Sequence, residues 1–344
     1  MVNTIILPMH ESKPILRKEG SDLYFYSVKI HSVNVSLQFP DFFVVGAPRC
    51  GTTAICRYLA RNPQICFSRP KEPHYFSRLD NDPSVDELKR DYLERNFSHF
   101  EPTHRAVGEG SVSYLYLPGV VERINQLNPQ ARFVVLVRNP LTMLPSYHLR
   151  MQFLLQEDQA DFGKAWDLEP SRDRGENIPK YCLETRLLKY SQVARFSVQI
   201  ERLFDLAGRD RSHVIVFDDF KSDLLGTYKK LLEFLDVDYD GQTEFERRFE
   251  SQMYRYGWLQ RLLFKPVTSG GKVVDTLQRR TRKYNPDGSK KPSFIKRVTN
   301  LNKIPMRPAP LSEQVADAIR ETLRPDVEHL SGLLNRDLSF WFDG

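Results

Sequence analysis

The stretch from residue 42 to residue 59 limits the folds open to this chain more than any other part of the sequence. Its first four residues are apolar and lack polar alternation, which is typical of a strand buried on both faces of a parallel sheet. Gly46 and Gly51 bound the short loop that follows. Apolar residues then recur at helical spacing, and Thr52 or Thr53 is expected to cap this helix. The stretch predicts a strand, a tight loop and a helix start that can bind an anion.

The loop has the Gly-x-x-x-x-Gly skeleton and the final hydroxyl of a nucleoside-triphosphate P-loop, but Thr52 stands where that motif requires lysine. A Mg²⁺-dependent P-loop kinase is therefore disfavoured, although it stays open as an alternative. The cation inside the loop is Arg49, whose planar guanidinium suits two oxygens of a phosphate or sulfate. Cys50 lies in the same loop, where a helix N-terminus can lower the pKa of a thiol, but we do not expect a nucleophile there.

A second anion-binding pattern follows the clearest buried strand, at residues 132 to 137. This strand delivers Arg138 to its C-terminal end, and Ser146 follows in the next predicted helix. A guanidinium and a hydroxyl can bind a phosphate monoester without a metal ion. Arg138 alone is also compatible with a cation that caps a helix. Together with the first loop, however, it favours a nucleotide site.

Two further segments carry carboxylates beside other polar or small residues. In the first, residues 68 to 76, two prolines keep the chain extended, so that Glu72 and its neighbours Lys71 and His74 stay outside a helix. A solvated ion pair is the alternative interpretation of this segment. The second carboxylate is Glu109, in a segment rich in small residues that we expect to be a loop at a strand end.

These motifs resemble those of sulfotransferases that use phosphoadenosine phosphosulfate (PAPS), in particular bacterial and carbohydrate-modifying members. Gly-Ala-Pro-Arg-Cys-Gly-Thr-Thr is similar to the family's 5′-phosphosulfate loop, and Lys-Glu-Pro-His-Tyr-Phe is similar to the segment that carries its base. The resemblance implies that Arg138 and Ser146 bind the 3′-phosphate. It implies that the 5′-phosphosulfate is bound by the residues of the first loop: Arg49, Cys50, Gly51, Thr52 and Thr53.

The resemblance also implies an in-line transfer of the sulfuryl group of PAPS to an acceptor hydroxyl, with adenosine 3′,5′-bisphosphate as the product and no metal. Glu72 would be the base, while Arg49 and Lys71 would stabilise the developing charge. His74 and Glu109 stay open as other bases. The acceptor is expected to be a carbohydrate. Because Arg49 replaces the lysine common in carbohydrate enzymes, a peptide tyrosine or a small alcohol also stays open.

The buried runs alternate with helical segments, which predicts an α/β fold: a P-loop-like, doubly wound parallel sheet flanked by helices in a single main domain. The suspected ligands follow the runs and should therefore lie at the C-terminal ends of strands. The runs are residues 42–45, 65–67, 133–137 and 214–217. Helical spacing predicts helices over residues 85–97, 181–206, 228–235 and 312–323.

We assign residues 41–344 to this sulfotransferase-like domain and residues 1–40 to an N-terminal extension, in which the alternation over 23–39 suggests a hairpin. Residues 156–180 are expected to form a long, lid-like loop. Residues 279–297 are strongly basic, either as a solvated face or as a rim for the nucleotide or an acidic acceptor. The last apolar stretch, residues 330 to 341, is expected to pack rather than to catalyse.

Composition limits the remaining classes of function. The formal net charge is +6, which fits an anionic ligand better than a dedicated duplex binder, and no nucleic-acid motif accompanies it. A non-enzymatic anion- or nucleic-acid-binding protein stays a further alternative, although it would not need Glu72. The four cysteines show no metal-binding spacing, and no apolar run approaches the ~18 residues of a membrane span. We therefore expect a cytoplasmic protein, unless it is part of a membrane-anchored parent; its oligomeric state stays open.

Overall fold

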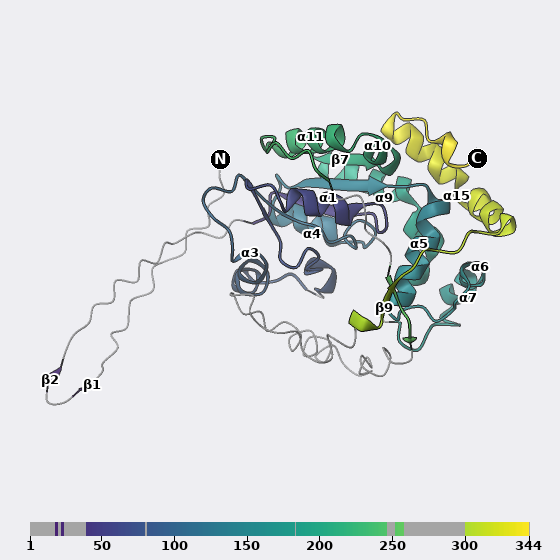
Figure 1. Cartoon of the computed structure of the whole chain (residues 1–344), viewed down its shortest axis with the longest axis horizontal. Helices are drawn as coiled ribbons and strands as arrows, with labels where there is room; N and C mark the ends of the chain where they lie inside the picture. Colours follow the sequence, from purple (N-terminus) through teal and green to yellow (C-terminus); the bar gives the residue numbers. More distant parts are fainter. Residues whose placement is uncertain are drawn as a thin grey trace.

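The computed structural model describes residues 39–79, 81–182, 184–245, 252–257 and 300–343, together with residues 18–19 and 22–23. Its centre is a five-stranded parallel sheet flanked by helices (Figure 1). In spatial order the strands are β4 (Ile65–Phe67), β5 (Ala106–Glu109), β3 (Phe42–Gly46), β6 (Arg132–Val137) and β7 (Ser212–Val216). The predicted α/β fold with a parallel sheet is confirmed, and every strand expected from a buried run is present.

The order of the strands places β3 in the middle of the sheet. From β3 the chain passes through α1 (Thr52–Leu59) to the edge strand β4 and returns to β5. It then crosses to the other side of β3 through α4 (Val120–Leu127), where it forms β6 and β7. Because all five strands are parallel, their C-terminal ends lie at one edge of the sheet. Ligands of such sheets bind at this edge, where the strand order reverses, and here that point is the end of β3.

The sequence analysis missed β5, because it treated residues 108–115 as a loop. Two of the four residues in β5 argue locally against a strand, Gly108 and the carboxylate Glu109. The structure explains the glycine, because a Cβ at Gly108 would overlap the aromatic ring of Phe42 on the neighbouring strand. Gly108 is therefore required by close packing against the neighbouring strand. This contact is with a residue far away in the sequence, so the local pattern did not predict β5.

Helix α5 (Pro140–Phe153) continues from β6 and carries much of the site. It begins at Asn139, whose side-chain oxygen accepts the N–H of Leu141 at 2.9 Å. The amide nitrogen of Asn139 donates to the backbone oxygen of Trp341 at 2.7 Å, and the indole of Trp341 donates to Asp218 at 3.0 Å. Trp341 is buried. The C-terminal stretch thus packs against the start of α5, as predicted.

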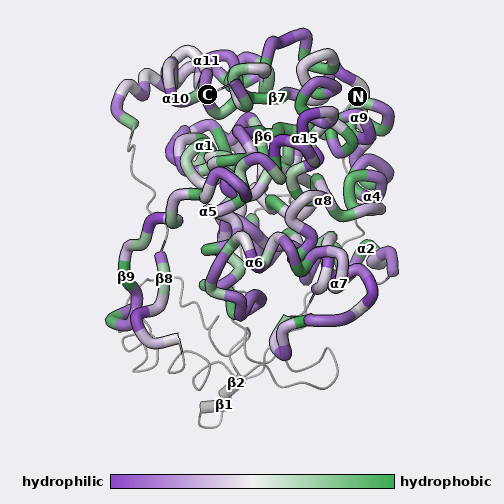
Figure 2. Tube along the Cα trace, turned by 90° about the vertical axis from the view of Figure 1, so that its right-hand side faces the viewer, coloured by the Kyte–Doolittle hydropathy of each residue, from purple (hydrophilic) through white to green (hydrophobic). Residues whose placement is uncertain are grey.

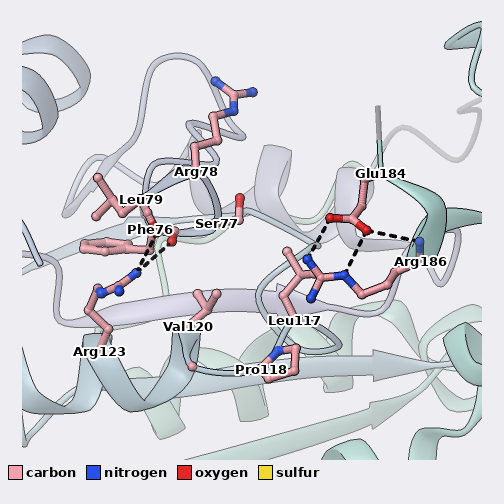
Figure 3. A pocket seen from close by; sticks show the side chains of 11 residues that line it. Phe76, Ser77, Arg78, Leu79, Leu117, Pro118, Val120, Arg123, Glu184 and Arg186 are labelled. Carbon is pink, nitrogen blue, oxygen red and sulfur yellow. Dashed lines mark hydrogen bonds and ion pairs between the residues drawn. The ribbon is translucent and has the colours of Figure 1, made fainter. Parts of the chain in front are cut away.

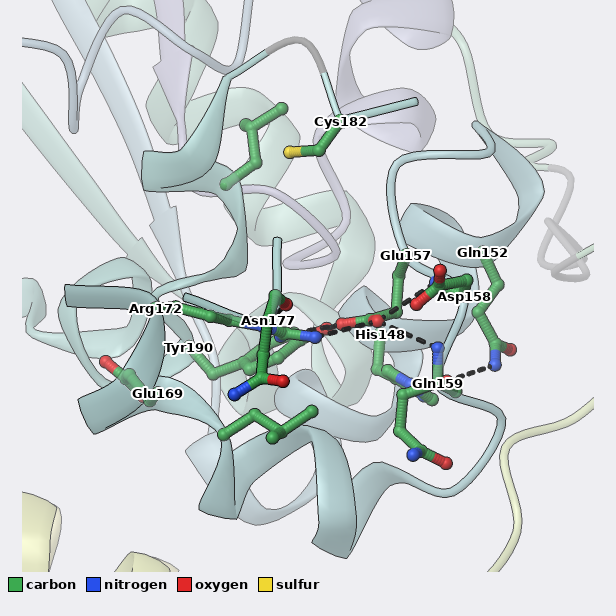
Figure 4. Close-up of polar contacts among 12 residues, drawn as sticks. His148, Gln152, Glu157, Asp158, Gln159, Glu169, Arg172, Asn177, Cys182 and Tyr190 are labelled. Atoms are coloured by element: carbon green, nitrogen blue, oxygen red, sulfur yellow. Dashed lines mark hydrogen bonds and ion pairs between the residues drawn. The ribbon is translucent and has the colours of Figure 1, made fainter. Parts of the chain in front are cut away.

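Residues 156–180 do not form the long loop that we expected. They include α6 (Phe162–Asp167) and α7 (Glu169–Asp173). Beneath these helices the buried carboxylate of Glu157 accepts two hydrogen bonds from the guanidinium of Arg172, at 2.8 and 2.9 Å, and one from Tyr190 at 2.7 Å (Figure 4). The segment is thus helical and is anchored to the core by a buried ion pair, whereas a lid-like loop would lack both features. The prediction of a loop is therefore wrong for this segment.

Several helix boundaries also differ from those predicted. The single helix expected over residues 181–206 is broken where the backbone of Lys189 and Arg195 leaves the helical conformation. Its pieces are η3 (Thr185–Leu188), α8 (Tyr190–Ala194) and α9 (Phe196–Ala207). The helix expected over 85–97 is present, with a π-helical turn in its middle: α2 (Val85–Glu87), η2 (Leu88–Leu93) and α3 (Glu94–Phe97). The last two helices are longer than predicted: α11 (Leu224–Leu235) and α15 (Glu313–Leu334).

Two short strand pairs lie outside the main sheet. Figure 2 shows β8 (Gln252–Tyr254) and β9 (Lys303–Pro305) side by side, as an antiparallel pair. Near the N-terminus β1 (Lys18–Glu19) pairs with β2 (Asp22–Leu23), also antiparallel. This pair precedes the hairpin expected over residues 23–39, which lies outside the described residues apart from its two end residues, as does the basic segment 279–297. In the described part of the chain, no helix is both long and apolar enough to cross a membrane.

Candidate active site

The loop after β3 leaves backbone donors for an anion. Helix α1 begins at Gly51, which has a φ of 98° and supplies no side-chain cap. The prediction that Thr52 or Thr53 caps the helix is therefore wrong. Within the described ranges, the N–H groups of Gly51, Thr52 and Thr53 donate to no protein acceptor. Because these N–H groups stand at the positive end of the helix dipole, they fit the oxygens of a phosphate or sulfate.

Cys50 contributes to the loop by packing inside the protein. Its thiol is buried and lies 3.5 Å from the backbone oxygen of Pro48, and its N–H donates to Ala47 at 3.4 Å. Burial raises the pKa of the Cys50 thiol to about 12, which opposes the lowering expected from a helix N-terminus. The side chain of Cys50 therefore packs into the core and supports the loop. Any contact that Cys50 makes with the cosubstrate would come from its backbone.

The two predicted phosphate motifs meet in space. Nε of Arg49, in the loop after β3, donates to the hydroxyl of Ser146 on α5 at 2.9 Å. Nη1 of Arg138, at the end of β6, donates to the backbone oxygen of Arg49 at 3.2 Å. Nε of Arg138 also donates to Thr142 at 3.0 Å, and its guanidinium lies 4.7 Å from the centre of the Phe217 ring. These contacts hold both arginines at the edge of the sheet where the strands end.

A third arginine, which the sequence analysis missed, belongs to the same group. Arg150 follows Ser146 by one turn of α5, so the two residues share a face of the helix. Burial, followed by the charges of Arg150 and Arg138, lowers the pKa of Arg49 to about 10. Arg49 thus lies within electrostatic reach of two other guanidinium groups, and this concentration of positive charge favours an anion. The spacing of four residues after Ser146 was the signal in the sequence.

The predicted base lies in a second polar group, after β4. The Glu72 carboxylate is 2.6 Å from Nζ of Lys71 and 3.4 Å from Nε2 of His74. His74 has a φ of 51°, rare for a residue with a side chain, and is held by Ser111 on its N–H at 2.9 Å and by Ser113 on Nδ1 at 2.8 Å. Burial opposes ionisation of Glu72, but hydrogen bonds and charges from His74 and Lys71 outweigh it and lower its pKa to about 2.

Glu109 is an unsuitable base, because it is fully buried beneath this group. One carboxylate oxygen accepts the hydroxyl of Tyr92 at 2.9 Å, while the other has no hydrogen-bond partner. Burial raises the pKa of Glu109 to about 7, against the hydrogen bond from Tyr92, which lowers it. Its neighbour Gly110 donates its N–H to the backbone oxygen of Lys71 at 3.0 Å. The end of β5 thus positions the loop that carries Glu72.

A separate cavity of about 320 Å³ lies beside η1 (Phe76–Arg78) and the start of α4 (Figure 3). Two of the arginines that line it have carboxylate partners. Arg186 forms hydrogen bonds with Glu184 at 2.9 and 2.7 Å, and Arg123 is 2.6 Å from Asp82. None of the predicted site residues lines this cavity. Elsewhere in the described ranges, no group of three or more His, Cys, Asp and Glu residues is arranged to hold a metal ion.

The range matched by a known family contains all five strands of the main sheet. The model of the sulfotransferase domain family matches residues 39–255. A solved structure of a sulfotransferase from Alicyclobacillus acidocaldarius superposes with a TM-score of 0.58 at 24% identity, over 88% of this chain and 99% of that one. It shows the same fold.

Two curated relatives match over shorter regions. The membrane-associated sulfotransferase kil1 of Dictyostelium discoideum is 28% identical over 124 residues, which are 34% of this chain and 24% of the relative. Human carbohydrate sulfotransferase 15 is 44% identical over 39 residues, 11% of this chain and 7% of the relative. The matches thus span a quarter or less of the length of these relatives.

Proposed function

The chain belongs to the sulfotransferase family, and from that premise we propose that it transfers the sulfuryl group of PAPS to a hydroxyl of a carbohydrate. The observation that carries the proposal is the meeting of both phosphate motifs, through Arg49, Ser146 and Arg138, at the strand ends. Family membership argues against the kinase alternative, as does the missing lysine in the loop.

In this proposal the protein binds two anionic groups of PAPS. The N–H groups of residues 51–53 and the guanidinium of Arg49 bind the 5′-phosphosulfate. Arg138 and Ser146 bind the 3′-phosphate. The Ser146 hydroxyl accepts a hydrogen bond from Arg49 and keeps its own hydrogen, which it can donate to a phosphate oxygen. No metal is needed in this proposal, because the guanidinium groups of Arg49 and Arg138 supply the positive charge.

The transfer forms a bond from the acceptor oxygen to sulfur and breaks the bond from sulfur to the bridging phosphate oxygen. Glu72 takes the proton of the acceptor hydroxyl. A carboxylate with a pKa of about 2 is ionised at neutral pH but weakly basic. Such a weak base can still accept the proton if the proton is transferred late. By then the new bond to sulfur has made the acceptor hydroxyl strongly acidic. Lys71 would then move toward the sulfuryl oxygens, which removes one cause of the low pKa of Glu72.

The acceptor in this proposal is a carbohydrate hydroxyl. Two observations support it: the Lys71-Glu72-Pro73-His74 segment and the short match to carbohydrate sulfotransferase 15. Arg49 in the loop keeps a peptide tyrosine as the alternative acceptor. Incubation with PAPS and matched sugar, tyrosine-peptide and alcohol acceptors, read by mass spectrometry, distinguishes these classes.

The nucleotide site is tested first, by calorimetric titration of the protein with adenosine 3′,5′-bisphosphate, adenosine 5′-monophosphate and Mg-ATP. We expect a clear preference for the bisphosphate. In Arg138→Ala that preference should fall by about 10- to 100-fold, the value of a hydrogen bond to a charged group. Arg90→Ala, which removes an exposed arginine on η2, is the control. Tighter binding of Mg-ATP would favour a kinase, and equal binding of the ligands a non-enzymatic anion-binding protein.

A further inference from the structure

We propose that Arg150 recognises a carboxylate or sulfate group on the acceptor, so that the protein prefers an acidic glycan to a neutral one. This inference rests on the proposed sulfotransferase function and adds the substrate class. It assigns to Arg150 a role that differs from those of the two arginines that bind the nucleotide.

The first argument is the spacing of polar groups along α5. Thr142, Ser146 and Arg150 follow one another at intervals of four residues and therefore lie along one face of the helix, about 6 Å apart. Thr142 contacts Arg138, and Ser146 contacts Arg49. Both contacts belong to the proposed donor site. Arg150 is the next group along the face, beyond Ser146, and it feels the charge of Glu72, the proposed base that the acceptor hydroxyl must reach.

The second argument is the charge around Arg150. The side chain is half-buried, and within the described ranges no carboxylate forms an ion pair with it. Burial lowers the pKa of Arg150, while the charges of Glu72 and Tyr254 raise it. Arg150 is therefore electrostatically coupled both to Arg49 on the nucleotide side and to the proposed base. A partly desolvated guanidinium between these groups is suited to an anion supplied by the acceptor.

The third argument is the surface next to Arg150. Its guanidinium lies 5.2 Å from the centre of the Phe153 ring, which stacks on Tyr254 of β8 at 4.5 Å and an interplanar angle of 11°. Nζ of Lys303, on β9, lies 5.9 Å from the same ring. The two rings cover each other's facing sides, but both side chains are partly exposed, and the cations beside them match acidic substituents of a sugar. The strand pair β8–β9 thus extends the surface around Arg150 beyond α5.

The test compares two acceptors that differ by one carboxylate, 4-nitrophenyl β-D-glucuronide and 4-nitrophenyl β-D-glucoside, with PAPS and the chain of residues 1–344. We expect kcat/KM to favour the glucuronide by about 10- to 100-fold. Arg150→Gln should remove this preference, with little change for the glucoside, and Arg150→Lys should restore part of it. Arg90→Gln, which removes the exposed arginine on η2, should leave the preference intact.

A second readout needs no turnover. Each glycoside is titrated into the complex of the protein with adenosine 3′,5′-bisphosphate, and the nucleotide is titrated into each variant. A glucuronide affinity that falls in Arg150→Gln, while nucleotide affinity holds, supports the inference even if the acceptor hydroxyls of these probes are not sulfated. An equal loss of activity toward both glycosides, or weaker nucleotide binding, would overturn it and assign Arg150 to the sulfuryl or nucleotide side. Absence of nucleotide binding in the unaltered protein would instead contradict the proposed function.

Discussion

Replacement of Arg172 by methionine is expected to destabilise the fold by about 3–5 kcal/mol, the cost of breaking a buried ion pair. The side chains of Arg172 and Glu157 are 1% and 0% exposed, so the carboxylate that remains cannot be hydrated. Glu157 would lose two charge-assisted hydrogen bonds, each worth about 1.5–3 kcal/mol. It would keep the hydroxyl of Tyr190 and the N–H groups of Asp158 and Gln159. These three donors place the expected cost near the lower end of the range.

Urea denaturation measures this loss, and limited proteolysis locates it. We expect new cleavage sites within residues 156–180 of the Arg172→Met protein, because α6 and α7 lose their buried anchor. Arg174→Ala is the matched control, since Arg174 and Glu176 form an exposed ion pair with 61% and 57% exposed side chains. Its removal should cost less than about 1 kcal/mol.

The double variant Glu157→Leu with Arg172→Met completes the experiment. Removing both charges leaves no unpaired charge in the interior, so part of the stability should return. A loss below about 1 kcal/mol in Arg172→Met, equal to that of Arg174→Ala, would refute the reasoning. The segment would then behave as the mobile lid that its polar sequence suggests.

Three further predictions concern single side chains. Glu72→Gln should lower kcat by about 10²–10⁴ without changing the affinity for adenosine 3′,5′-bisphosphate, and equal weakening of both would argue against a base. Because the folded-state pKa of Glu109 is raised from 4.5 to about 7, its protonated form stabilises the fold below pH 4.5, and this contribution is lost as the pH rises through 7. Glu109→Gln should thus be the more stable protein at pH 8, by up to about 3 kcal/mol, in urea denaturation, and should lose that advantage at pH 4. Iodoacetamide followed by mass spectrometry should modify the partly exposed Cys182 before the buried Cys50, whose pKa is raised to about 12; the reverse order would contradict the packing of the loop.

The features that could be predicted from the sequence are those encoded by short local patterns. Runs of apolar residues identified β3, β6 and β7, because strands covered on both faces need no polar alternation. Since parallel strands end at one edge, Arg49 and Arg138 could be expected to lie near each other before any coordinates were known. Their contact through the backbone of Arg49 agrees with that reasoning.

The features that could not be predicted depend on partners far away in the sequence. The buried pair of Glu157 and Arg172 turns a polar, proline-containing segment into packed helices, and a one-dimensional pattern of charges does not distinguish such a pair from solvated residues. Arg150 was missed for a related reason. Its position matters only once α5 is known to continue past Pro145 and to meet β8.

In our proposal the first part of helix α5 binds the sulfuryl donor, and its last turn recognises the acceptor. Contacts with Arg138, Arg49 and the C-terminal Trp341 fix the end that begins at Asn139. The far end meets β8 through the ring of Phe153. In our proposal, substitutions in the last turn alter which molecule is modified while the donor site stays unchanged. Donor binding and acceptor choice then belong to opposite ends of one helix, and each can change without the other.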